Sequence, residues 1–131
     1  MGIDVLGKGV FREYNIGGLF NQGSTGIFAI KGHFNWNTGI AYIDVLNGAN
    51  GDFCERYAIM GNLDTATSVN KNLKRCFAAT ENHCQVYYNN NRVVFTCNGV
   101  LLAKVVTNNL LTVSTAASDI DITGLTEKTF D

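Results

Sequence analysis

The chain has 131 residues, of which 46% are hydrophobic and only 16% charged, and its formal net charge is −1 at pH 7. This length predicts one domain over residues 1–131 with a sizeable core. A net charge so close to zero argues against nucleic acid and anionic membrane surfaces as partners. No apolar run approaches the roughly 18 residues of a membrane span, so we expect no membrane insertion. Most surface polarity must come from uncharged groups, chiefly the 16 Asn.

Alternating segments in the first half of the chain predict β-strands that are separated by glycine- and asparagine-rich turns. The first covers residues 10–14 and ends at Gly17 and Gly18. The longest covers residues 27–36 and has one apolar face, made of Phe28, Ile30, Gly32, Phe34 and Trp36. Returning strands are expected at residues 40–46 and 53–60.

Residues 62–82 fit two patterns. Ser68 is a possible helix cap, followed by apolar residues at helical spacing, namely Val69, Leu73, Cys76 and Phe77. Asn70 and Asn72 weaken such a helix, because asparagine competes with the backbone for hydrogen bonds. We therefore expect a short strand with a loop.

Residues 84–97 predict a β-hairpin whose turn is made of asparagines. Both arms are rich in β-branched and aromatic residues. If the loop spans residues 89–92, Tyr88 lies opposite Val93 and Cys84 lies opposite Cys97, so that the apolar faces of the two arms coincide. We expect Cys84 and Cys97 to be cross-strand neighbours, with reduced thiols if the protein matures in a cytosol.

The rest of the chain predicts three further strands. Residues 100–106 are almost continuously apolar, which suggests burial on both faces, and residues 110–114 and 120–122 follow after turns. About nine short strands at this spacing predict an all-β fold, an antiparallel β-sandwich or a barrel, of which a jelly roll is a natural case.

Catalytic and metal-binding signatures are weak. A cysteine nucleophile would need an accessible thiolate beside His33 or His83, but the cysteines fit core or strand positions better. Residues 44–52 carry oxygen ligands suited to Ca²⁺ at a spacing that turn formation also explains. Asp119 and Asp121 would share one strand face. We expect no enzyme and no cofactor, and Walker and dinucleotide-binding glycine patterns are absent.

The strongest binding candidate is Trp36, which stands between Asn35 and Asn37 at a strand end. An aromatic face flanked by amides suits a sugar, because C–H groups stack on the ring while amides bind the hydroxyls. The competing interpretation makes Trp36 part of the core face of its strand. Tyr87 points away from the core face of its own strand, which makes it a candidate contact or interface residue.

Two segments, residues 24–32 and 86–95, resemble strand–turn segments of the C-terminal head domains of bacteriophage tail fibres and related receptor-binding proteins. The short strands, the Asn/Gly turns and the uncharged polar surface are similar along most of the chain. The resemblance implies a non-catalytic, homotrimeric β-sandwich that binds a host cell-surface glycan. It also implies a place at the tail-fibre tip of the virion, after assembly in the bacterial host cytoplasm.

Two other functions remain open from the sequence. A closed barrel of the lipocalin kind would hold a small apolar ligand inside, and it would need an interior too large for side chains to fill. A cysteine- or metal-dependent enzyme would need a reactive thiol or a bound metal.

Overall fold

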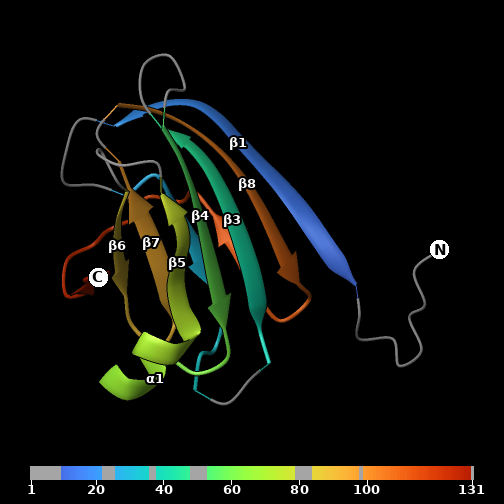
Figure 1. Cartoon of the computed structure of the whole chain (residues 1–131), viewed down its shortest axis with the longest axis vertical. Helices are drawn as coiled ribbons and strands as arrows, with labels where there is room; N and C mark the ends of the chain where they lie inside the picture. The colour runs from blue at the N-terminus through green and yellow to red at the C-terminus, as the bar shows by residue number, and fades with distance from the viewer. Residues whose placement is uncertain are drawn as a thin grey trace.

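The computed structural model describes residues 10–21, 26–35, 38–47, 53–78, 84–97 and 99–130. It is an all-β sandwich, as the sequence predicted, in which two five-stranded antiparallel sheets pack face to face (Figure 1). Sheet A has the order β1 (Phe11–Asn21), β8 (Gly99–Asn108), β3 (Ile40–Asn47), β4 (Phe53–Met60) and β5 (Leu73–Ala78). Sheet B has the order β10 (Thr126–Lys128), β6 (Gln85–Tyr88), β7 (Arg92–Thr96), β2 (Phe28–Lys31) and β9 (Thr112–Ser114).

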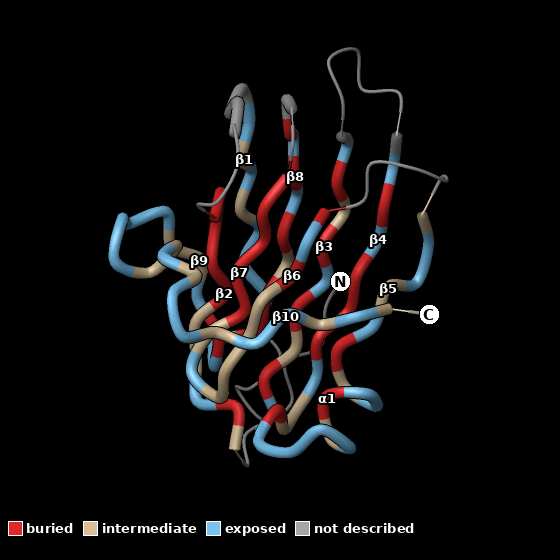
Figure 2. The backbone as a smooth tube through the Cα atoms, turned by 90° about the vertical axis from the view of Figure 1, so that its left-hand side faces the viewer, coloured by how far each residue is buried: buried red, intermediate tan, exposed pale blue. Residues whose placement is uncertain are grey.

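The core lies between the sheets and is built by alternation along the strands. On β3, Ala41, Ile43 and Val45 are buried, and Figure 2 shows the same alternation of buried and exposed residues along β8. The Phe28 ring stacks on the Phe95 ring, with 4.9 Å between centroids. The rings of Phe95 and Tyr57 pack edge to face, with 5.1 Å between centroids. Aromatic side chains from both layers fill the interior, so the fold is a sandwich and not the closed barrel of the lipocalin alternative.

A buried polar network joins the two sheets. Glu55 on β4 is only 2% exposed, and its carboxylate accepts hydrogen bonds from the Tyr57 hydroxyl and the Cys84 backbone N–H. Arg75 on β5 donates to the Tyr57 hydroxyl at 3.2 Å and to the Cys84 carbonyl at 3.3 Å. Burial, followed by the bond to Glu55, raises the pKa of Tyr57 above its ordinary value. These contacts explain how a carboxylate can be buried in the core.

The predicted hairpin is confirmed, register included. Tyr88 lies opposite Val93, and the ladder continues to Gln85 opposite Thr96. The next residues along both arms are Cys84 and Cys97. Both are buried and in the thiol form, and their side chains are hydrogen-bonded to each other.

Two strands in the first half differ in length from the prediction. β1 does not end at Gly17 and Gly18 but continues to Asn21, because a register shift between Ile16 and Leu19 absorbs the glycines as a bulge. β2 ends at Lys31 instead of residue 36. The following residues pair with the β6–β7 turn, where the Gly32 N–H donates to the Asn91 carbonyl. The strands predicted at residues 40–46 and 53–60 are β3 and β4.

Residues 62–82 contain both a helix and a strand. The expectation of a short strand with a loop, and no helix, was wrong. Helix α1 (Ala66–Asn72) runs directly into β5. Its cap is Thr65, not Ser68, because the Thr65 side chain accepts from the Ser68 N–H at 3.1 Å. Val69 and Leu73 are buried in the core, which anchors this short helix. No helix in the described ranges is long and apolar enough to cross a membrane.

The apolar strand expected to be buried on both faces was a wrong prediction. On β8, Leu101, Ala103 and Val105 are buried, but Leu102 and Lys104 point outward and are exposed. The last predicted strand, residues 120–122, is also wrong, because these residues lie in a turn-rich segment held over sheet B. The final strand of the described residues is β10, which pairs with β6, and the sheets together have ten strands where about nine were expected.

Candidate functional site

One end of the sandwich gathers asparagine side chains from separate segments; we call it the amide end, defined by Asn35, Asn62, Asn72 and Asn90. The segments meet through backbone hydrogen bonds. The Phe34 N–H donates to the Asn90 carbonyl at 2.8 Å, and the Leu63 N–H donates to the Phe34 carbonyl at 2.6 Å. Figure 1 shows α1 and the β6–β7 turn at this same end.

Two of these amides carry an unsatisfied oxygen. The Oδ1 atoms of Asn35 and Asn62 are buried and have no hydrogen-bond partner among the described residues. Buried acceptors are normally paired, with protein groups or with bound water or ligand. An amide oxygen of this kind retains its full capacity to accept a hydrogen bond.

The other amides shape the surroundings. Asn72 donates from Nδ2 to the Asn62 carbonyl at 2.8 Å and borders a hollow of about 250 Å³ between Gly39 and Gly61. The β6–β7 turn is held in shape by Asn89. Its Oδ1 accepts hydrogen bonds from the backbone N–H groups of Asn91 and Arg92, at 2.8 and 2.9 Å. The amide end is therefore a preformed polar surface.

The sequence-predicted binding residues divide between three situations. Trp36 and Asn37 lie outside the described residues. Asn35 belongs to the amide end. Tyr87 is confirmed to point away from the core, but it lies on the outer face of sheet B, in register with Val94 and Glu127. Partial burial, followed by the negative charge of Glu127, raises the pKa of the Tyr87 hydroxyl.

A second surface of interest is the outer face of sheet A, which we call the bare face. Six large apolar side chains lie 41–53% exposed on it: Phe11, Tyr42, Leu46, Met60, Phe77 and Leu102. Leu46, Phe77 and Leu102 border a hollow of about 780 Å³ that spans the strands of the sheet. Charged side chains cross the middle of the face. The Asp44 carboxylate accepts from the Arg56 Nε at 2.6 Å, and this bond raises the pKa of Arg56.

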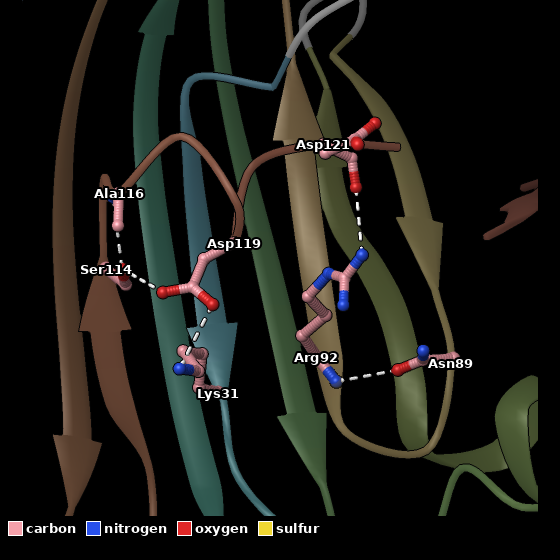
Figure 3. Close-up of polar contacts among 7 residues, drawn as sticks. All are labelled: Lys31, Asn89, Arg92, Ser114, Ala116, Asp119 and Asp121. Atoms are coloured by element: carbon pink, nitrogen blue, oxygen red, sulfur yellow. Dashed lines mark hydrogen bonds and ion pairs between the residues drawn. The ribbon is translucent and has the colours of Figure 1, made fainter. Parts of the chain in front are cut away.

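The outer face of sheet B is covered by residues 115–125, which we call the strap. Figure 3 shows Asp119 bound to Lys31 on β2 and to Ser114 on β9, at 3.0 and 2.6 Å. Arg92 on β7 donates from Nη2 to the Asp121 carbonyl at 3.0 Å. The hydrogen bond from Ser114, followed by Lys31, lowers the pKa of Asp119. The two aspartates thus serve to fasten a loop, and the expectation that they share one strand face was wrong.

The remaining catalytic and metal candidates do not assemble among the described residues, and His83 lies outside them. His33 is exposed, whereas Cys84 is buried, and its hydrogen bond to Cys97 and its burial raise the pKa of its thiol, which opposes thiolate formation. Asp44 of the suggested calcium loop pairs with Arg56, while residues 48–52 lie outside the described residues. No group of three or more His, Cys, Asp or Glu that could hold a metal occurs among the described residues.

Sequence reasoning missed Asn62, Asn72 and Asn90 as site residues. All three were visible as part of the unusual number of asparagines, but no local motif joins them. They are brought together by the backbone pairing of residues 32–35 with the β6–β7 turn and with residue 63, and by the side-chain hydrogen bond from Asn72 to Asn62. Neither a protein-family model, a curated protein nor a solved structure matches the chain.

Proposed function

We propose that this chain is a non-catalytic recognition domain that binds a cell-surface glycan at its amide end. The observation that carries the proposal is the pair of buried oxygens, of Asn35 and Asn62, that have no hydrogen-bond partner among the described residues. Sugar hydroxyls are hydrogen-bond donors that match such acceptors, and amide N–H₂ groups nearby can bind hydroxyl oxygens in return. Trp36 follows Asn35 in the chain and is the candidate for stacking on the sugar ring.

Two further features support recognition rather than catalysis. The amide end lies on turns and loops carried by a rigid sandwich, which is a common placement for binding residues. Its described members are uncharged, so they suit a neutral ligand such as a hexose. The resemblance to phage tail-fibre heads extends the proposal to attachment of a virion to its host. The resemblance also implies a homotrimer. The glycan proposal does not depend on the number of chains, because a single chain carries the whole amide end.

The test is a glycan array probed with the labelled protein, followed by calorimetry with the best ligand. Asn35→Ala and Asn62→Ala should each weaken binding about tenfold or more, the effect of losing one buried hydrogen bond of roughly 1.5 kcal/mol. Their unfolding free energies should change little, because neither oxygen has a partner among the described residues to lose. Asn15→Ala, on the bare face, is the matched control and should bind as the wild type does.

Trp36→Ala distinguishes the two interpretations of that residue. As a contact, it should abolish glycan binding while the β-rich circular dichroism spectrum persists. As a core residue, it should lower stability by roughly 3–5 kcal/mol. Absence of any glycan ligand, or unchanged affinity in both asparagine variants, would reject the proposed site.

A further inference from the structure

The bare face of sheet A lacks, among the described residues, the cover that the strap gives to sheet B. Leu46 and Leu102 are neighbours in register on one side of the charged middle of the face and remain 43% and 46% exposed. Tyr42 and Val106 form a second neighbouring pair, and Tyr42 is 44% exposed. Large apolar side chains gathered on one exposed face are typical of an interaction site.

A row of charges crosses the same face between these two apolar pairs. Lys104 on β8 lies opposite Asp44 on β3, which lies opposite Arg56 on β4. On the other side, Glu13 on β1 reaches Lys104, with 3.7 Å between its carboxylate and the ammonium nitrogen. Because the strand order is β1-β8-β3-β4, the row runs from the uncharged Asn15 on β1 through positive, negative and positive side chains on β8, β3 and β4, while Glu13 reaches Lys104 from the position opposite Val106.

We propose that a second copy of this chain covers the bare face, related by a two-fold axis parallel to the strands and midway between β8 and β3. This operation reverses the row, so that Lys104 of each copy faces Asp44 of the other, and Asn15, which is in register with Lys104 on β1, faces Arg56. An isologous interface requires such a self-complementary patch. A two-fold axis along the row would instead set each charge against its own counterpart, which is repulsive.

The same two-fold rotation also brings apolar residues of the two copies together. The axis sets Leu102 of one copy against Leu46 of the other, and Val106 against Tyr42. Apolar pairs therefore meet apolar pairs on both sides of the charge row. The contact would combine apolar burial with opposed charges, the arrangement that gives a protein interface both affinity and register.

The experiment measures mass by light scattering over a dilution series at low ionic strength. The wild type should show twice the 14.3 kDa chain mass. Lys104→Glu alone should be monomeric, because the introduced carboxylate would face Asp44 in both halves of the interface. Asp44→Lys alone should be monomeric, because the introduced ammonium would face Lys104. An equimolar mixture of the two variants should form a dimer again, since every facing pair is then of opposite sign.

Lys71→Glu and Asp64→Lys are the matched controls, because they make the same charge changes at exposed positions on and beside α1. Both should remain dimeric. A wild-type monomer would overturn the proposal, and so would a trimer, the state that the resemblance implies. Dimers that survive both single substitutions, or a mixture that stays monomeric, would reject this axis. None of these readouts depends on glycan binding, so the two proposals fail separately.

Discussion

On the outer face of sheet B, Ala29 and Val94 are fully buried beneath the strap, whereas on the outer face of sheet A Leu102 and Phe77 remain 46% and 53% exposed. Both faces carry apolar residues that alternate with the core-facing set, so strand patterning does not explain the contrast. The difference is the strap, which is held down by its polar bonds to Lys31, Ser114 and Arg92.

The comparison shows that, among the described residues, one outer face is covered by the chain itself and the other is not. A protein that uses a turn-rich segment to cover sheet B has no equivalent cover on sheet A in its described residues. Covering an exposed apolar face with a partner buries apolar area and stabilises the folded chain. The face under the strap is already buried, so a partner would add little stability there.

The largest expected effect comes from placing a charge on each face. Val94→Asp should lower the unfolding free energy by roughly 3–5 kcal/mol, because it leaves an unpaired charge under the strap. Leu102→Asp should change the stability of the monomer by no more than about 0.5 kcal/mol, because the new carboxylate lies in water. Urea unfolding of dilute protein measures both. Equal losses would show that the two faces do not differ in the way described.

A smaller effect is expected from adding one methyl group to a glycine on each face. A Cβ at Gly26 would lie 2.2 Å from Val94 Cγ1 and 2.7 Å from the Ile120 carbonyl oxygen in the strap. Gly26→Ala should therefore cost about 1–3 kcal/mol through overpacking. A Cβ at Gly17 meets only the flexible end of Leu102, at 2.9 Å. Gly17→Ala should leave the thermal midpoint close to that of the wild type, and a large loss there would contradict an open face.

Local periodicity made much of the fold predictable. The hairpin register, with Tyr88 opposite Val93, followed from matching apolar faces across an asparagine turn. β3 and β4 followed from alternation alone. The same reasoning failed on β8, because Leu102 is apolar yet faces outward, and periodicity cannot tell an uncovered apolar face from a buried one.

The candidate site was less predictable because it is assembled by tertiary contacts. Asn35 could be proposed from its place beside an aromatic residue, but Asn62 joins it only through the bond from Leu63 to Phe34. The buried Glu55 also had no sequence signal, because its partners are fixed by the pairing of separate strands. Helix α1 was missed because its cap and the burial of its one apolar anchor outweigh the low helix propensity of its asparagines.

The smallest expected effect concerns acid sensitivity, and it should belong to the strapped face. The folded-state pKa of Asp119 lies below the ordinary value of 3.8, chiefly through Ser114 and then Lys31. A depressed carboxyl pKa adds stability that is present above the unfolded-state pKa and is lost as the pH falls through the folded-state pKa. The wild type should accordingly lose stability below about pH 4, and Asp119→Asn should lose part of that pH dependence together with some stability at neutral pH.

Asp44→Asn is the control on the bare face, where the carboxylate is paired with an exposed Arg56. Exposed ion pairs contribute little, so this substitution should leave both the stability and its pH dependence close to those of the wild type in dilute protein. Urea midpoints at pH 7 and pH 3 for all three proteins provide the measurement. The compared quantity is the difference in urea midpoint between pH 7 and pH 3. If Asp44→Asn reduced this difference as much as Asp119→Asn does, the acid sensitivity would not be specific to the Asp119 carboxylate that fastens the strap. A larger loss in Asp119→Asn alone would tie acid sensitivity to closure of the sheet B face.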